Sequence, residues 1–144
     1  MAKYNVYSLA DTKVIVNHPD VGQCVISEAG GGRVVIAYSG DMSTHTVSAT
    51  GYPVINKLRN LAGSVTLELP HNSDTDLWMR KWCAYIDASP SSTYALTTVN
   101  ITDYANGRQY NCVGVTPQKR PDVNYDQSST FRNYVLLCAE ITES

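Results

Sequence analysis

The chain has 144 residues, and its 13 acidic residues nearly balance its 11 lysines and arginines. This length fits one domain, residues 1–144, which could bury roughly two-thirds of its unfolded surface in a single core. The charges are scattered, which argues against a basic patch for nucleic acid or a polybasic membrane anchor. No apolar run has the length of a signal peptide or a bilayer span, so we expect a protein of cytosolic origin with no membrane anchor.

Most of the chain is predicted to form short strands, because runs rich in β-branched and aromatic residues alternate with turn residues. Asn106 and Gly107 tolerate the positive φ of a tight hairpin turn, so they predict the clearest hairpin. The glycines at 30–32 are expected to form another turn, and residues 116–130 form the one long loop. The predicted strands are residues 13–17, 23–27, 33–39, 44–49, 54–58, 64–69, 94–101, 108–115 and 131–141.

One helix is expected among these strands, at about residues 74–87. Polar and apolar residues alternate up to Leu69, and after Pro70 the apolar period becomes helical. Ser73 precedes Asp76 by three residues, which is the spacing of a helix N-cap. We expect the apolar stripe of this helix to pack in the core or at a subunit interface. Its members are Leu77, Trp78, Trp82, Tyr85 and Ile86.

Many short strands with a single helix predict a mainly β fold, either a β-sandwich or a partly closed β-barrel. The four cysteines lie inside strand-like or helical runs and form no C-x-x-C pair. We therefore expect buried, reduced thiols rather than disulfides or a zinc site. These cysteines are Cys24, Cys83, Cys112 and Cys138.

No catalytic, cofactor or metal site is predicted. His18, His45 and His71 have no ligand spacing and are interpreted as turn or strand-surface residues. Asp74 and Asp76 fall in the first helical turn, where carboxylates interact favourably with the helix dipole, so they are interpreted as structural. The glycines at 30–32 lack a following Gly-Lys-Ser/Thr, and no serine occupies a G-x-S-x-G elbow. A small enzyme using His71, Asp74 and Asp76 is a weak alternative, and we expect no enzyme.

Three segments, taken in order, resemble the tail tube proteins of contractile-tailed bacteriophages. They are "VIVNHPDVGQCVISEAGGGRVVIAYSGDMSTHTVSATG", "LAGSVTLELPHNSDTDLWMRKW" and "GVTPQKRPDVNYDQSSTFRNYVLLCAEI". The resemblance spans nearly the whole chain and rests on the order and spacing of these segments. Pro53, Lys57 and Arg59 depart from it, because a plainer glycine-containing turn is expected there.

The resemblance implies a tail-tube-like protomer that assembles with itself into hexameric rings, which stack into a tube. The lumen of such a tube conducts double-stranded DNA during infection without binding it specifically, and no cofactor is needed. The implied partners are tail sheath, baseplate and tape-measure proteins. The implied location is the virion tail, assembled in the cytoplasm of the host bacterium.

Contacts between rings are expected in residues 41–60 and 117–130, because these segments combine length, proline and mixed charge. The candidate contact residues are Asp41, Tyr52, Lys57, Arg59, Lys119, Arg120, Asp122 and Tyr125. A conduit for DNA should have a neutral or acidic lumen, because each phosphate neutralised by Lys or Arg strengthens binding. The alternative function is a monomeric β-sandwich binding module that recognises carbohydrate or peptide through exposed aromatic residues.

Overall fold

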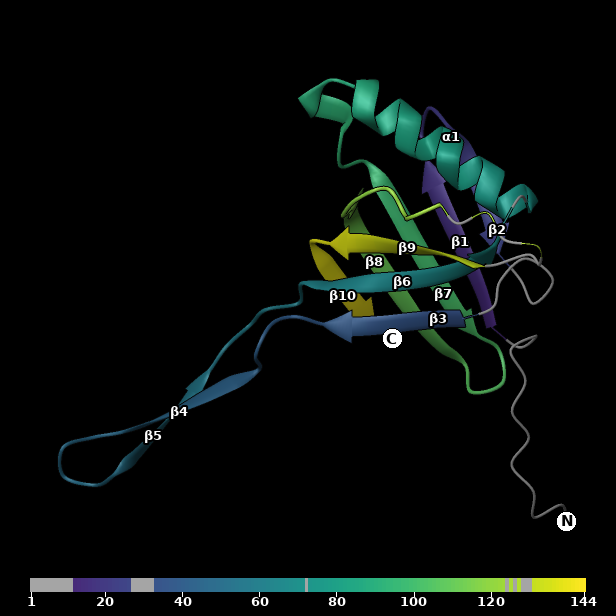
Figure 1. Cartoon of the computed structure of the whole chain (residues 1–144). Helices are drawn as coiled ribbons and strands as arrows, with labels where there is room; N and C mark the ends of the chain where they lie inside the picture. The colour runs from purple at the N-terminus through teal and green to yellow at the C-terminus, as the bar shows by residue number, and fades with distance from the viewer. Residues whose placement is uncertain (1–11, 27–32, 72, 124, 126, 128–130) are drawn as a thin grey trace, which may run out of the picture.

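The computed structural model describes residues 12–26, 33–71, 73–123, 125, 127 and 131–144. The secondary structure of these residues is mainly β, with one α-helix (Figure 1). The elements are β1 (Thr12–His18), β2 (Gly22–Ile26), β3 (Arg33–Tyr38), β4 (Ser43–Val47), β5 (Pro53–Lys57), β6 (Gly63–Pro70), α1 (Asp74–Ala88), η3 (Ser91–Thr93, a 3-10 turn), β7 (Thr97–Asp103), β8 (Arg108–Pro117), β9 (Phe131–Cys138) and β10 (Glu140–Glu143).

Two antiparallel sheets cross at a steep angle and share strand β8 (Figure 1). The first sheet contains β2, β1, β7, β8 and β10, and the second contains β8, β9, β6 and β3. The sheets do not close, so β2 and β3 are left as edges. Helix α1 packs against β2 and β6 and covers the open side between the sheets. This arrangement confirms the predicted mainly β fold, in the form of an open sandwich.

Strand β8 passes from one sheet to the other at a corner formed by Gly114. Gly114 has φ 63°, and a Cβ at this position would approach the Ala139 Cβ to 2.7 Å. The amide of Ala139 donates to the Val113 carbonyl at 3.1 Å, so the neighbouring strand bends at the same point. The single strand predicted for 131–141 is therefore wrong: it is β9 and β10, broken at Ala139 because the chain turns between sheets there.

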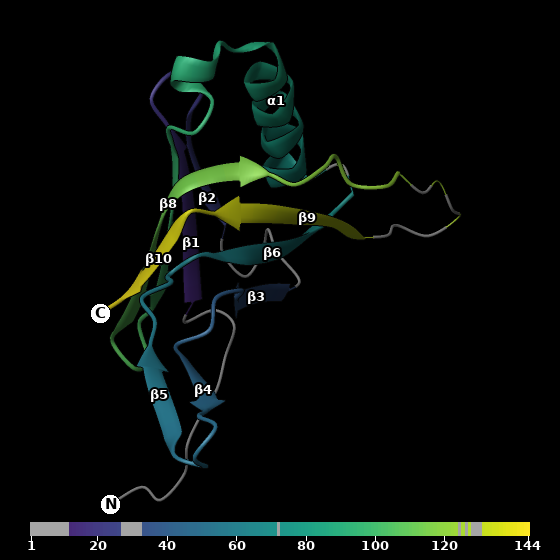
Figure 2. The same ribbon diagram turned by 90° about the vertical axis from the view of Figure 1, so that its left-hand side faces the viewer.

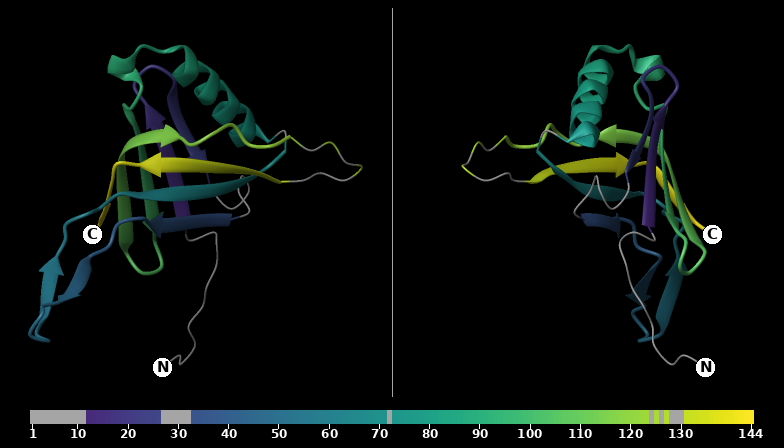
Figure 3. Two further views of the ribbon diagram at one scale, coloured as in Figure 1. Left: turned by 60° about the vertical axis from the view of Figure 1, so that its left-hand side comes forward. Right: turned by 90° about the vertical axis from the view of Figure 1, so that its right-hand side faces the viewer.

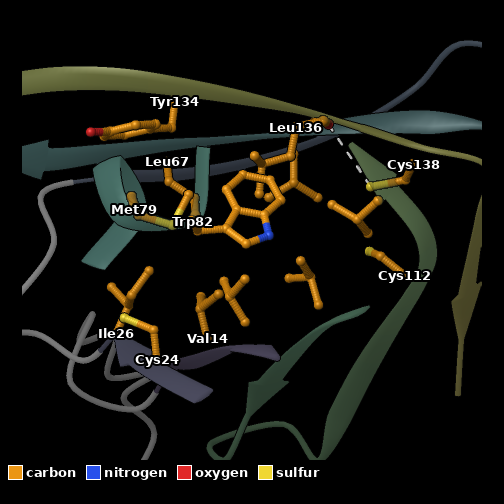
Figure 4. Packing of buried hydrophobic residues seen from close by; sticks show 14 of the residues in the cluster. Val14, Cys24, Ile26, Leu67, Met79, Trp82, Cys112, Tyr134, Leu136 and Cys138 are labelled. Atoms are coloured by element: carbon orange, nitrogen blue, oxygen red, sulfur yellow. Dashed lines mark hydrogen bonds between the residues drawn. The ribbon is translucent and has the colours of Figure 1, made fainter. Parts of the chain in front are cut away.

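The core lies between the two sheets and α1, and Trp82 is near its centre (Figure 4). Alternate residues of β6 are buried, including Val65, Leu67 and Leu69, as the sequence predicted. The fully buried Trp82 donates its indole N–H to the Thr97 hydroxyl at 2.9 Å. All four cysteines are buried, as the sequence predicted, and they are unpaired in the structure. Burial raises the pKa of the Cys24 thiol to about 11.

Helix α1 begins as predicted, because the Ser73 hydroxyl accepts from the Asp76 amide at 3.2 Å. The predicted core stripe is only partly correct. Trp82 and Ile86 are buried, but Trp78 is only half-buried, and Leu77 and Tyr85 are 48% and 40% exposed. The buried stripe is turned by about one residue around the helix and consists of Asp76, Met79, Trp82, Cys83 and Ile86. It uses the spacings of three and four residues that put side chains on one helix face.

His18 is fully buried, so its interpretation as a surface residue is wrong. Its Nδ1 accepts from the Asp20 amide at 3.1 Å, and its ring meets the Tyr85 ring edge-on with centroids 5.4 Å apart. The Tyr85 hydroxyl donates to Asp20 at 3.0 Å. These contacts join the β1–β2 turn to α1, so Tyr85 packs on this turn rather than in the core.

Two other predictions concern turns. Gly107 adopts φ 69° in the β7–β8 hairpin, as predicted. The strand predicted from 94 begins later, at Thr97, because Pro90 leads into the η3 turn that occupies the preceding residues. The glycine turn predicted at 30–32 lies outside the described residues.

Candidate assembly interface

Strands β4 and β5 form a two-stranded arm that projects away from the sandwich (Figures 1 and 2). They pair only with each other among the described strands, and no arm residue belongs to the hydrophobic core. The base of the arm is fixed by backbone hydrogen bonds from Leu58 to Met42 at 2.9 Å and from Ser39 to Ala62 at 3.0 Å. These hydrogen bonds fix the position at which the arm joins the body of the protomer.

The arm exposes large apolar side chains to solvent. Met42 is 82% exposed, Tyr52 73% and Ile55 68%, and Val47, Val54 and Leu58 are also exposed. An isolated two-stranded hairpin is at best marginally stable in water. Contiguous exposed apolar surface commonly marks a protein–protein contact. The arm thus has the properties of a segment that packs on another chain.

The predicted contact residues fall into two groups. Asp41, Tyr52, Lys57 and Arg59 are exposed on the arm or at its base. Lys119, Arg120, Asp122 and Tyr125 are exposed on the segment between β8 and β9, which leaves a different side of the body (Figure 3). The two groups are not brought together within one protomer.

The described contacts of the second group lie near the surface of the protomer. Arg120 forms an exposed ion pair with Asp87 at 3.6 Å, and the Tyr125 ring meets His71 edge-on with centroids 5.5 Å apart. Tyr125 is 82% exposed despite that contact. Exposed ion pairs contribute little to stability, so the Arg120–Asp87 pair would cost little to break on contact with another chain.

The face of the first sheet that points away from the core is polar and almost uncharged. Asn100 donates to Asn111 at 2.8 Å and accepts from Thr102 at 3.0 Å, so neighbouring strands share hydrogen bonds across this face. The alternation of each strand assigns to this face Lys13, Ile15, Asn17, Gln23, Val25, Thr98, Asn100, Thr102, Gln109, Asn111, Val113, Glu140 and Thr142. Its single lysine and single glutamate cancel. We call this surface the amide face.

A buried polar cluster under α1 was not predicted. The Tyr134 hydroxyl donates to the Asp76 carboxylate at 2.7 Å, and Arg80 and Arg132 approach that carboxylate at 3.5 and 3.7 Å. Burial and the Asp76 hydrogen bond raise the pKa of Tyr134, although Arg132 opposes the shift. The sequence held two signals: Arg80 follows Asp76 by four residues, and Arg132 shares the strand phase of buried Tyr134.

In the part of the chain that the structure describes, no cluster of three His, Cys, Asp or Glu side chains could hold a metal ion. His71 and Asp74 are not joined to Asp76 in any catalytic arrangement among the described contacts. Asp76 instead belongs to the helix cap and the ion cluster, in keeping with a structural role. No helix within the described ranges has the length and apolar character needed to cross a membrane.

Among the described strands, β2 and β3 each pair on one side only, and an apolar arm projects from the sandwich. These features are typical of a structural subunit that assembles with other chains. A family model described as bacteriophage PhiTE tail tube protein matches residues 4–144. The chain therefore belongs to this tail tube protein family, and it is a structural protein rather than an enzyme. No curated protein sequence matches the chain.

Several solved structures share the fold at low sequence identity. The sheath/tube terminator of an extracellular contractile injection system, PVC, is 12% identical, with a TM-score of 0.63 over 99% of each chain. A chain of the anti-feeding prophage baseplate, six-fold symmetrised, is 10% identical, with a TM-score of 0.65 over 100% of this chain and 97% of that one. The tube-terminating cap of the same prophage is 14% identical, with a TM-score of 0.60 over 100% and 93% of the two chains.

Proposed function

We propose that this protein is the structural subunit of a contractile phage tail tube, in which hexameric rings stack around a lumen that conducts DNA. Membership of the tail tube family over residues 4–144 is the observation that carries this proposal. Six-fold rings are supported by analogy with the similar chain of the six-fold symmetrised baseplate. Tail sheath, baseplate and tape-measure proteins are the proposed partners in the virion tail, which assembles in the host cytoplasm.

Ring closure would use the two sheet edges. β2 and β3 end the path of the sheets, and their outer backbone groups are available for pairing with a neighbouring chain. A head-to-tail contact between two different surfaces forms a closed ring when its rotation divides evenly into a circle. Ring formation would therefore remove edges that otherwise favour aggregation.

Stacking of rings would use the arm and the segment between β8 and β9. The arm carries apolar side chains that have no cover in the protomer, and the second segment leaves the body elsewhere (Figure 3). Because the two lie apart, an arm from one ring can pack on a different part of a protomer in the next ring. Asp41, Lys57 and Arg59 would add polar contacts around the arm.

The lumen would be lined by the amide face. This face has no helix over it, and its described charges sum to zero. None of the cations at Lys57, Arg59, Lys119 and Arg120 lies on it. A lumen of amides and hydroxyls offers DNA no row of cations to displace its counterions, so the genome would pass without being held.

The monomeric binding module is less well supported. Of the aromatic residues of α1 that it could use, Trp82 is in the core and Trp78 is half-buried, although Tyr52, Tyr104 and Tyr125 are exposed elsewhere. Tyr85 is already engaged by His18 and Asp20.

Electron microscopy of the purified protein tests the proposal. We expect stacked six-fold rings, with Asn100 and Asn111 on the lumen wall, and no DNA-binding shift at about 0.15 M salt. Uniform small particles at high protein concentration would contradict tube formation. A salt-dependent shift in the micromolar range, or a lumen lined by Lys57 or Arg120, would contradict the proposed conduit.

A further inference from the structure

A pocket of about 280 Å³ lies between α1, β9 and the segment after β8. Three arginines line it: Arg80 from the helix, Arg132 from the strand and Arg120 from the segment. Cys83, Pro121 and Val123 contribute apolar wall. The pocket is thus a cationic site with a partly apolar lining. Ionic contacts in it are stronger than in bulk water, because the local dielectric constant is lower.

The arginines exceed the carboxylates available to them. Asp76 is fully buried and is the only described carboxylate in ion contact with Arg80 and Arg132. Its oxygens are 3.5 Å from the Arg80 Nε and 3.7 Å from the Arg132 Nη1, and Oδ1 also accepts from Tyr134 at 2.7 Å. Arg120 contacts the exposed Asp87 at 3.6 Å. Among the described residues, one buried carboxylate therefore faces two guanidinium groups, and one positive charge is left unbalanced.

Several guanidinium N–H groups in this pocket have no hydrogen-bond acceptor in the part of the chain that the structure describes. They are the Nε and Nη2 of Arg80 and the Nε of Arg132, all buried. The Arg132 side chain is only 7% exposed, so water reaches it poorly. Buried donors without an acceptor are rare, because no hydrogen bond compensates for the free energy of removing them from water. The Nε and Nη2 of one arginine lie on the same edge of its planar group, and this edge binds both oxygens of a carboxylate.

We propose that this arginine pocket is a carboxylate-binding site. The carboxylate comes from an acidic side chain of a neighbouring copy of the chain in the tube, or from a free carboxylate in solution. The first source rests on the proposed function, whereas the second does not. Either one supplies the missing negative charge and acceptor oxygens for the Arg80 Nη2, which lies beside the Nε that Asp76 approaches, and for the Arg132 Nε.

Thermal unfolding of unassembled protein tests the site itself. Sodium acetate, compared with sodium chloride at the same concentration of about 0.1 M, should raise the Tm of the wild-type protein by roughly 2–4 °C, as expected for a ligand present well above its Kd. Arg80→Gln should abolish this difference. Lys81→Gln is the matched control, because it removes the same charge from the next, exposed position of α1 and should keep the difference.

Arg80→Lys is a second variant that tests whether the acetate difference is lost merely because Arg80→Gln misfolds. It keeps the charge and the aliphatic stem but loses the two donors on one edge of the guanidinium group. We expect a circular dichroism spectrum like that of the wild type and a smaller acetate difference. Absence of an acetate difference in the wild type, or an equal difference in Arg80→Gln, overturns the site.

Sedimentation of assembled tubes distinguishes the two sources. A neighbouring carboxylate predicts that Arg80→Gln raises the protein concentration needed for assembly by about tenfold, as expected when roughly 1.4 kcal/mol of contact energy is lost, while Lys81→Gln leaves it unchanged. An acetate difference together with unchanged assembly assigns the site to free carboxylates. If the wild-type protein forms no tubes, the proposed function fails, and the acetate measurement still decides whether the pocket binds a carboxylate.

Discussion

Replacement of Trp82 by alanine should remove a large part of the stability of the protomer. Trp82 has no exposed surface, and it is packed among Leu67, Met79 and Leu136 at the centre of the core (Figure 4). Truncating a buried Trp costs about 3 to 5 kcal/mol, because the transfer term and the cavity term add. Small domains have total unfolding free energies of about 5 to 15 kcal/mol, so this loss is a substantial fraction of the whole.

The hydrogen bond of Trp82 can be measured separately from its packing. Trp82→Phe keeps most of the ring but removes the N–H, and it leaves the buried Thr97 hydroxyl without its partner. We expect this change to cost about 1 to 3 kcal/mol, and Thr97→Val to strand the indole N–H at a similar cost. The double variant should recover about 1 kcal/mol of the summed losses, because neither partner is then left unsatisfied.

Urea unfolding of unassembled protein, followed by circular dichroism, is the assay. With a slope of about 2 kcal/mol per M, a loss of 4 kcal/mol lowers the midpoint by about 2 M. Trp78→Ala is the matched control, since it is the same change on the same helix at a half-buried position, and it should cost less than about 2 kcal/mol. A loss below about 1 kcal/mol for Trp82→Ala, or equal losses for both tryptophans, would refute the packing described for α1.

Five further results are expected. Native protein should react slowly with a thiol reagent and fully after denaturation, because burial holds the Cys24 pKa at about 11; two disulfides in protein purified without oxidant would contradict this. Gly114→Ala should lower the free energy of unfolding by about 1 kcal/mol or more, because Gly114 has φ 63° and the new Cβ would meet Ala139. An unchanged urea midpoint would argue against the β8 corner at Gly114. The unfolding free energy should fall as pH rises above about 10, where unfolded Tyr134 ionises but the folded residue, with its raised pKa, does not; the fall should be smaller in Tyr134→Phe. Tyr52→Ser should impair tubes, whereas the same change at the similarly exposed Tyr104 should not; equal effects would remove the arm from the stacking contact. Deleting part of residues 119–128 should leave a folded protomer and shorten tubes, and unchanged tubes would exclude this segment from stacking.

Local pattern was sufficient to predict most strands and the start of the helix. The alternation at Val65, Leu67 and Leu69 reflects a strand with one buried face, which is a property of neighbouring residues alone. The Ser73 cap is equally local. The break at Ala139 was not predictable in this way, because the bend is required by Gly114 on another strand, which pairs with this region only in the folded protein.

The helix face shows a related limit. Leu77 and Tyr85 fit helical spacing as well as Met79 and Cys83 do, so periodicity alone left the rotation of the helix open by about one residue. The rotation is fixed by tertiary partners: Asp76 accepts a hydrogen bond from Tyr134, and Trp82 donates one to Thr97. Asp76 places a charged group among the buried apolar residues of α1, which hydrophobic patterning does not predict. Burial of this carboxylate is tolerated because the Tyr134 hydroxyl and the Arg80 and Arg132 side chains interact with it.

The candidate contact segments remain a prediction. Residues 41–60 were selected for length, proline and mixed charge, and in the structure their exposed apolar side chains lie outside the described core. The strands of the amide face show the complementary pattern, with Thr, Asn and Gln alternating against buried Val and Ile. An apolar arm must find cover, so it favours assembly, whereas a face of amides and hydroxyls is satisfied by water and by its own hydrogen bonds, such as Asn100 to Asn111. In the proposed tube, the arm would bind a neighbouring subunit, whereas the amide face would need no partner and could line an open lumen.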